Sequence, residues 1–390
     1  MKKNLKDLKV AVVTDPLRAL GGQEKHLLGI LDSFPNSDLY TAWYDREAIE
    51  EWFGDRKIKA SFIQYLPFHK LFNRFLLLLN PWAYRSFNFK KYDVVISISI
   101  HFAKFVKTRS KDIPHINVCL SPPKFLWQHE DRNLTGPDKL KEGVNKLLYR
   151  FYNLFVGGPL EKIWQRWDFN AAQKVDYMIA NSKTVQERIK RIYKRDSDVM
   201  YPPVDVSGMK VNTGKRENWF FYVGRIETYK GIDLAIKACA EAGVPFKVSG
   251  KGTCLEEMKQ LIKDLNAKGL IKMLGFVPDE QKYEMLQKTK ALIFPVKGED
   301  SGIVPIEAMA AGAPVIAYRD GGPTETVSEE NPKTGVFFDK YDYKELAKIL
   351  KNFDPDEFDP VNCRKQAENF DTKLFIFKMR AYVEDVISKY

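Results

Sequence analysis

Short apolar runs alternate with longer segments of helical spacing along most of this chain. The runs 9–15, 92–100 and 175–182 are followed by the segments 21–34, 101–108 and 183–193, which have the apolar spacing of helices. The same alternation begins again after Asn218 and continues to residue 322. Neighbouring parallel strands need crossover connections, and helices supply them on both faces of the sheet. The chain is therefore predicted to be an α/β protein with two Rossmann-like parallel-sheet domains.

The stretch 200–218 separates the two halves. It carries two prolines, two glycines and few apolar residues, which is the composition of an interdomain connection. We place the hinge at 204–217, the first domain at 1–207 and the second at 208–370. Open sheets of this kind bind ligands beyond the carboxyl ends of their strands, and two such domains facing each other form a cleft. We expect the functional site at the strand-to-helix turns that line this cleft.

Length and cysteine usage exclude several classes of protein. The 390 residues suffice for two domains with separate cores. The four cysteines form no C-x-x-C pair, so neither a zinc site nor a disulfide framework is expected, and a reducing compartment fits best. Val10–Val13 is too short for the core of a signal peptide, and Phe75–Leu79 is far below the roughly 20 residues that span a bilayer. A cytoplasmic location is expected.

The net charge of +11 is unevenly distributed. Residues 139–195 carry 13 Lys and Arg against 5 Asp and Glu. The stretches 68–92 and 146–167 mix basic residues with Phe, Trp, Tyr and Leu, as segments that rest on an anionic membrane surface do. The alternative, that the aromatic residues are core and the cations solvated, fits the composition equally. No nucleic-acid recognition element accompanies the basic residues, so no nucleic-acid partner is expected.

An acidic pair flanks a glycine turn in the segment 298–317. Glu299 precedes the turn, and Glu307 lies on the helix expected to start near Val304. Glycine at 302 lets backbone N–H groups approach a phosphate, the helix N-terminus favours negative charge, and a carboxylate there can accept ribose hydroxyls. The simpler alternative is that Glu307 only favours the helix N-terminus and that Glu299 is a loop charge.

A cationic turn follows the first strand of the second half. Gly224 and Arg225 follow this strand, and Lys230 and Gly231 lead into the next helix. An Arg fork and a Lys ammonium can neutralise a departing diphosphate without a metal, and no D-x-D motif with metal-ligand candidates is present. We therefore expect neither a metal nor another cofactor. Solvated surface cations are the alternative.

Gly250 and Gly252 give two glycines of a dinucleotide fingerprint. The third position is Leu255, and no suitable acid follows the next strand, so a nicotinamide enzyme is disfavoured.

At this level of detail the chain resembles glycosyltransferase family 4, whose members are retaining enzymes of the GT-B fold. The resemblance covers nearly the whole chain in the family's order. It rests on the segments 21–27, 97–106, 119–127, 202–205, 224–231, 250–252, 275–277, 299–317 and 321–327. The segment 121–127 is similar to a mannosyltransferase subgroup of surface-polysaccharide and lipopolysaccharide biosynthesis.

The resemblance implies a role for each matching residue. Arg225 and Lys230 would bind the donor diphosphate, Glu307 the ribose, and Glu299 the transferred sugar. His101 would lie near the reacting centre. Further donor contacts would come from the glycines and loops at strand ends: Gly21, Gly22, Gly250, Gly275, Phe276, Val277, Gly302, Ile303 and Val304. Ser301 departs from the family, which usually has an aromatic residue there.

The implied reaction moves a hexose from a nucleotide-diphosphate sugar to a lipid-linked saccharide or polysaccharide. GDP-mannose is the favoured donor and a UDP-sugar the alternative; residues 371–390 would form a helix that crosses back to the first domain. Lys104, one turn after His101, is either a second site cation or a helix-surface lysine. A nucleotide-sugar epimerase of the same fold and a non-catalytic nucleotide-sugar-binding subunit remain alternatives.

Overall fold

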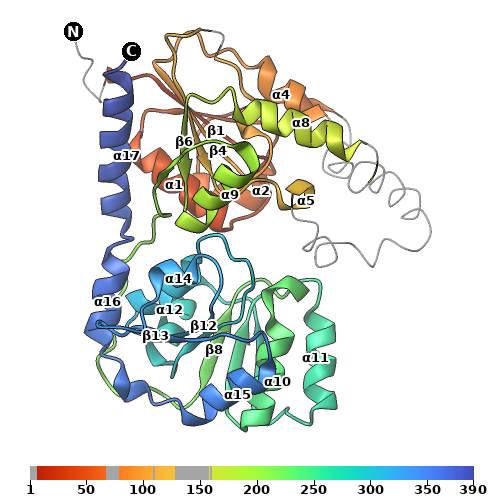
Figure 1. Ribbon diagram of the computed structural model, residues 1–390, viewed down its shortest axis with the longest axis vertical. Helices are drawn as coiled ribbons and strands as arrows, with labels where there is room; N and C mark the ends of the chain where they lie inside the picture. The colour runs from red at the N-terminus through yellow and green to blue at the C-terminus, as the bar shows by residue number, and fades with distance from the viewer. Residues whose placement is uncertain (1–6, 67–78, 109, 128–157, 159) are drawn as a thin grey trace. The chain divides into compact units, whose positions relative to one another are not determined.

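The computed structural model describes residues 7–66, 79–108, 110–127, 158 and 160–390. The chain divides into two compact units, Met1–Pro203 with Lys373–Tyr390, and Val204–Thr372 (Figure 1). The division falls inside the proline- and glycine-containing connection, just before the boundary placed at 207/208. Each unit is an α/β domain around one parallel sheet, as the alternating pattern predicts.

The N-terminal sheet has the strand order β3-β2-β1-β4-β5-β6-β7, and all its pairings are parallel. Its strands are β1 (Val10–Thr14), β2 (Asp38–Thr41), β3 (Ile58–Ala60), β4 (Val94–Ser99), β5 (His115–Cys119), β6 (Tyr177–Ala180) and β7 (Asp198–Val199). Its helices are α1 (Gly22–Ser33), α2 (Arg46–Phe53), α4 (Asn80–Ser86), α5 (Lys124–Trp127), α8 (Glu161–Ala172) and α9 (Lys183–Tyr193).

Both faces of this sheet are covered, because alternate strand residues point to opposite sides. Val10 and Val12 pack into a cluster with α1, whereas Ala11 and Val13 pack into a cluster with α4 and α8. The strands are accordingly apolar throughout, as in buried parallel sheets.

The prediction of a helix at residues 101–108 is wrong. Residues 101–108 form only the short 3-10 helix η4 (Ala103–Phe105). The backbone closes only i to i+3 bonds there, from Phe105 to Phe102 and from Val106 to Ala103, while the N–H groups before them donate to the carboxylate of Asp15, the residue directly after β1.

The C-terminal sheet has the order β10-β9-β8-β11-β12-β13, again entirely parallel. Its strands are β8 (Phe220–Val223), β9 (Phe246–Ser249), β10 (Ile271–Gly275), β11 (Leu292–Phe294), β12 (Val315–Tyr318) and β13 (Gly335–Phe338). Its helices are η6 (Thr228–Lys230), α10 (Ile232–Ala242), α11 (Leu255–Asp264), α12 (Asp279–Lys288), α13 (Ile303–Ala310), α14 (Pro323–Thr326), α15 (Tyr343–Asn352), η7 (Pro355–Glu357) and α16 (Pro360–Glu368).

The last helix, α17 (Thr372–Ile387), belongs to the N-terminal domain's core. Its buried side chains, among them Phe375 and Met379, lie in the same apolar cluster as β1 and α1. The packing is close, because a Cβ at Gly29 of α1 would lie 2.5 Å from Pro203 and 3.2 Å from Phe375.

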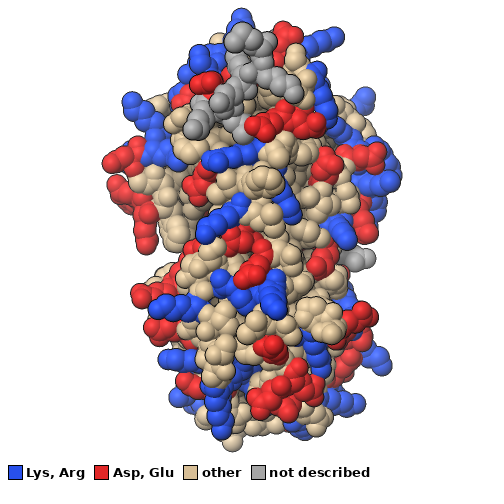
Figure 2. Space-filling model, turned by 90° about the vertical axis from the view of Figure 1, so that its left-hand side faces the viewer, with Lys and Arg blue, Asp and Glu red and all other residues tan. Residues whose placement is uncertain are grey.

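Charges of both signs are interspersed on the face drawn in Figure 2, which shows no single basic stripe. None of the helices in the described parts of the chain is both long and apolar enough to cross a membrane. Of the apolar run Phe75–Leu79, only Leu79 lies within the described residues.

We expect Met379→Ala to lower the free energy of unfolding of the N-terminal domain by about 2–5 kcal/mol, because Met379 is fully buried. Phe377→Ala is the matched control on the same helix, since Phe377 is 70% exposed, and should change it by less than about 0.5 kcal/mol. Denaturant titration measures both. Equal effects of the two variants would contradict the packing of α17 described above.

Two buried histidines make this domain sensitive to acid. Burial lowers the pKa of His26 and of His115 from 6.5 to about 3. Between these values the unfolded chain binds protons that the folded chain does not, so stability falls as the pH drops from 6.5 toward 3. Both ring nitrogens of His26 are buried without a hydrogen-bond partner. His26→Leu should therefore flatten the pH dependence of the unfolding free energy over this window; an unchanged slope would contradict the assignment.

Candidate functional site

Glycines bring three loops of the C-terminal domain together at the carboxyl ends of β8, β9 and β10. Gly250 donates its N–H to the Gly275 carbonyl at 2.8 Å. A Cβ at Gly250 would lie 1.8 Å from the Gly224 oxygen, and one at Gly252 would lie 2.0 Å from the Ile226 oxygen. Gly250 also has a φ of +152°. Only glycine permits this backbone contact, so the two fingerprint-like glycines are explained by the packing of the loops.

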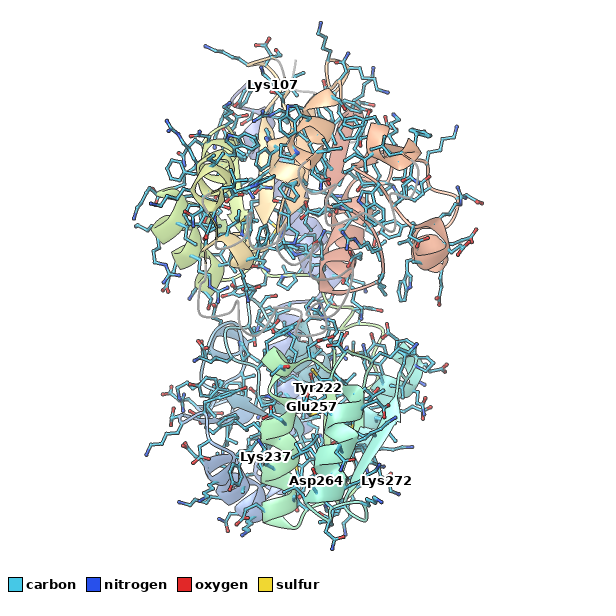
Figure 3. The ribbon with its side chains drawn as sticks, turned by 90° about the vertical axis from the view of Figure 1, so that its right-hand side faces the viewer. Lys107, Tyr222, Lys237, Glu257, Asp264 and Lys272 are labelled. Atoms are coloured by element: carbon cyan, nitrogen blue, oxygen red, sulfur yellow. The ribbon has the colours of Figure 1, made fainter. Side chains whose placement is uncertain are left out.

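The cationic turn after β8 belongs to this group of contacting loops. The Tyr222 hydroxyl donates to the Arg225 carbonyl at 2.9 Å and so fixes the end of β8; Tyr222 is labelled in Figure 3. The Lys230 ammonium lies 2.7 Å from a Glu299 carboxylate oxygen, and both side chains are mostly buried. The cation predicted for the diphosphate and the acid predicted for the sugar are therefore direct neighbours.

The Glu299 loop is held by the turn after β12. Gly298 donates its N–H to the Asp320 carboxylate at 2.8 Å, and Gly322 donates to the Glu299 carbonyl at 3.0 Å. A Cβ at Gly321 would lie 2.2 Å from the Glu299 oxygen. This close approach fixes the backbone on which the Glu299 side chain depends.

The same turn packs against Ser301, the position at which the sequence departs from the glycosyltransferase pattern it resembles. A Cβ at Gly322 would lie 2.5 Å from the Ser301 Cα, and the Ser301 side chain is buried. Gly302 follows with φ +72° and is the residue before α13, so Ile303 and Val304 form the first turn of that helix, as expected.

Glu307 of α13 is 3% exposed and bonds the Lys282 ammonium at 2.9 Å. Lys282 also contacts Asp279 at 2.9 Å. Burial alone would lower the pKa of Lys282, but Glu307 and Asp279 raise it above the usual value, so the ammonium stays charged. No sequence pattern points to Lys282, because α12 reads as an ordinary amphipathic helix.

Phe276 offers an exposed aromatic surface directly after β10. Gly275 has φ +72°, Val277 is buried, and the Phe276 ring is 64% exposed with the Lys251 ammonium 4.9 Å from its centre. A flat ring at a strand's carboxyl end suits the predicted contact with a nucleobase.

In the N-terminal domain, Asp15 organises the loop that follows β4. Its carboxylate accepts four backbone N–H bonds, from Ile100 and His101 at 2.8 Å and from Phe102 and Ala103 at 2.8 and 2.9 Å. Asp15 lies directly after β1, which pairs with β4, so both groups meet at the carboxyl edge of the sheet. A single Asp after a strand carries no distinctive sequence pattern, and the sequence did not single it out.

His101 sits in this loop with its ring 5.5 Å from the ring of Phe125. Its Nδ1 is buried and has no hydrogen-bond partner. Burial lowers the pKa of His101, Asp15 opposes the shift and Lys104 adds to it. The ring is thus a neutral imidazole near pH 7, able to accept or donate one hydrogen bond.

Lys104 is neither a surface lysine nor an open site cation. Its ammonium is buried, lies 2.6 Å from Asp168 and donates to the His101 carbonyl at 2.7 Å. Asp168 of α8 also accepts from the Trp127 indole at 2.8 Å and the Tyr193 hydroxyl at 2.7 Å. The His101 loop is therefore held through its N–H groups by Asp15 and through its carbonyl by Lys104.

Gly21 and Gly22 begin α1 near the end of β1. The Gly21 N–H bonds the Glu24 carboxylate at 2.9 Å, and the absence of a side chain leaves this helix N-terminus open.

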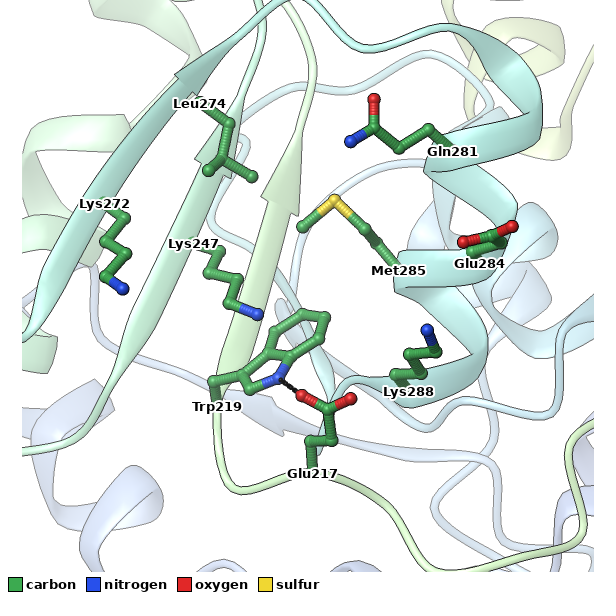
Figure 4. A pocket seen from close by; sticks show the side chains of 9 residues that line it. All are labelled: Glu217, Trp219, Lys247, Lys272, Leu274, Gln281, Glu284, Met285 and Lys288. Atoms are coloured by element: carbon green, nitrogen blue, oxygen red, sulfur yellow. Dashed lines mark hydrogen bonds between the residues drawn. The ribbon is translucent and has the colours of Figure 1, made fainter.

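A surface hollow of the C-terminal domain lies apart from the predicted residues. A hollow of about 410 Å³ is lined by Trp219, Lys247, Lys272, Leu274 and their neighbours, and no predicted site residue lines it (Figure 4). Within the described ranges, no group of three or more His, Cys, Asp or Glu could hold a metal ion.

Comparison with known proteins identifies the C-terminal domain. Residues 209–370 match the family model described as glycosyl transferases group 1. The alpha-1,3/1,6-mannosyltransferase ALG2 of Dictyostelium discoideum is 25% identical and is matched over 95% of this chain and 94% of its own. The Candida albicans ALG2 is 24% identical, over 95% and 96%.

A solved structure shows the same fold over the whole chain. Sucrose-phosphate synthase from Thermosynechococcus elongatus superposes with a TM-score of 0.73 at 16% identity, covering 98% of this chain and 100% of that one.

We expect Asp15→Asn to lower the unfolding free energy of the N-terminal domain by about 3 kcal/mol, because an amide would turn an NH₂ group toward donors that now bond a carboxylate. The amides of residues 100–103 should then exchange with solvent faster. Asp55→Asn, at an exposed position in the same domain, is the control. Hydrogen exchange with mass spectrometry measures the effect; unchanged protection of residues 100–103 would contradict the role assigned to Asp15.

Proposed function

We propose that this chain is a retaining glycosyltransferase of the GT-B fold and that it transfers α-mannose from GDP-mannose to a lipid-linked saccharide. The premises are its group 1 domain and its two parallel-sheet domains. The named activity of the full-length relatives, alpha-1,3/1,6-mannosyl transfer, supports the choice of sugar. The observation that carries the proposal is the convergence of Lys230, Glu299 and the first turn of α13 at the carboxyl edge of one sheet.

The leaving group would be stabilised by cations. As the bond between mannose and the diphosphate breaks, negative charge grows on the phosphate oxygens, and Arg225 and Lys230 lie at the end of β8 to meet it. The backbone N–H groups of Ile303 and Val304 at the start of α13 add donors for the same charge. Because Lys230 already pairs with Glu299, the diphosphate would share an ammonium whose position is set beforehand.

Donor recognition would divide among three neighbouring groups. Glu307 would accept the ribose hydroxyls, with Lys282 keeping its carboxylate ionised and in place. Glu299 would orient the mannose hydroxyls, and Phe276 would contact the base. A buried carboxylate that accepts hydroxyl hydrogens disfavours ligands that lack them, since its remaining acceptor positions would be left without hydrogen bonds.

Retention of configuration would not require an enzymic nucleophile. The acceptor hydroxyl would attack the face that the diphosphate leaves, and the departing phosphate would take its proton. The enzyme's contribution is then positioning and electrostatic stabilisation. In the N-terminal domain, His101 would contact the sugar near its reacting carbon, and the open turn at Gly21 and Gly22 would leave room for the acceptor.

A lipid-linked acceptor sets the place of the reaction. A water-soluble donor and an acceptor anchored in a bilayer meet at a membrane surface. Because the cysteine usage favours a reducing compartment, we propose a peripheral location on the cytoplasmic face of a membrane.

We expect GDP and GDP-mannose to raise the thermal unfolding midpoint of the C-terminal domain without added metal, with UDP- and ADP-sugars giving smaller shifts. Glu307→Ala should abolish the shift, because it removes the ribose acceptor and leaves Lys282 without its buried partner. Glu256→Ala is the control, since Glu256 is exposed and pairs with Lys259 of the same helix, α11. Differential scanning fluorimetry measures all three proteins.

Product analysis separates the alternatives. A GDP-dependent shift with a mannosylated lipid as product supports the transferase, whereas an isomerised nucleotide sugar would identify an epimerase. A shift without any product would identify a binding subunit, and no shift with any nucleotide would contradict the donor site.

A further inference from the structure

Helices α4 and α8 of the N-terminal domain lie side by side (Figure 1). Both helices expose large apolar side chains. Trp82 of α4 is 51% exposed, and Ile163 and Trp167 of α8 are 46% and 37% exposed. The Trp82 and Trp167 rings meet edge to face with centres 5.5 Å apart. Ile163 and Trp167 are one helical turn apart and share a face. We call these three residues the α4–α8 patch.

The exposed charged residues of α4 and α8 themselves have one sign. Arg85, Lys162 and Arg166 are exposed. The only acids of the two helices, Glu161 and Asp168, are buried. The water-facing side of this helix pair therefore combines cations with indole rings and has no exposed carboxylate of its own.

The inner side of the same helix reaches the candidate site. Asp168, the residue after Trp167, bonds the Lys104 ammonium at 2.6 Å, and Lys104 donates to the His101 carbonyl at 2.7 Å. Helix α8 thus exposes Ile163 and Trp167 of the patch on one side and holds the His101 loop, through Asp168 and Lys104, on the other.

The other aromatic residues near the patch are buried instead of exposed. Tyr84, Phe87, Phe89 and Trp164 are buried in the core, as the simpler interpretation of these stretches expects. The parts 68–78 and 146–157 lie outside the described residues. The exposure of Trp82 and Trp167 is therefore a specific feature and not a general property of an aromatic-rich segment.

We propose that the α4–α8 patch seats this domain on an anionic lipid surface. Indole rings favour the boundary between headgroups and acyl chains, and lysine and arginine side chains can extend from there to anionic headgroups. The bound orientation brings the His101 loop to the level at which a lipid-linked acceptor presents its saccharide; this last step rests on the proposed function.

The test is co-sedimentation of the full chain with vesicles of phosphatidylcholine alone or of an equal mixture with phosphatidylglycerol. The wild type should bind only the mixed vesicles, and less so at high salt. Lys162→Ala with Arg166→Ala should weaken binding by about 30-fold, from about fivefold per charge. Trp82→Ala with Trp167→Ala should weaken it by at least about tenfold, because two rings no longer leave water. Trp52→Ala is the matched control, since Trp52 is also 37% exposed but lies on α2 beside Glu50 and Glu51.

Absence of vesicle binding by the wild type, equal binding to both vesicle types, or full binding by the tryptophan double variant would overturn the proposal. Unchanged thermal midpoints show that the variants are folded. A failure of the nucleotide-dependent shift would contradict the donor site and leave the vesicle result intact, so the two proposals fail separately.

Discussion

Four backbone N–H groups converge on the buried carboxylate of Asp15, and the N-terminal half of the candidate site depends on that interaction. A buried carboxylate without hydrogen bonds would be strongly destabilising. Movement of the loop after β4 away from Asp15 would leave the Asp15 charge buried without its hydrogen-bond donors. The Lys104–Asp168 ion pair acts on the same loop through the His101 carbonyl. His101 itself is left with an unpartnered ring nitrogen, while everything around its backbone is fixed.

The C-terminal domain uses a related arrangement. Two carboxylates, Glu299 and Glu307, are each paired with a lysine from another loop or helix, Lys230 and Lys282. A partly buried charge is tolerated when its partner is in place, and breaking one such pair leaves the other charge uncompensated. The donor would bind to charges that are already positioned, which lowers the ordering cost of recognition.

The fold was predictable from the chain because its information is local. Alternation of apolar runs and helical spacing predicts parallel strands and crossovers, and both sheets confirm it.

The failures come from contacts between residues distant in sequence. Residues 101–108 have helical spacing, yet the loop is held by Asp15 and Lys104 and forms a single 3-10 turn. Lys104 has the sequence context of a surface lysine and becomes buried because Asp168, Trp127 and Tyr193 form a polar network around it. Lys282 and Asp15 were not predicted for the same reason: one charged residue on an amphipathic helix or after a strand is too common to mark a site. The roles assigned to Arg225, Glu299, Glu307 and His101 remain predictions.

In the proposed reaction these groups catalyse transfer of α-mannose with retention of configuration. The most direct measurement supplies GDP-mannose labelled with ¹³C at the anomeric carbon and a lipid-linked saccharide, and follows the one-bond carbon–hydrogen coupling of the product by NMR. The account predicts a single new α-mannosyl linkage, lost in Glu307→Ala. A β-linked product, or free mannose with no linkage formed, would contradict it.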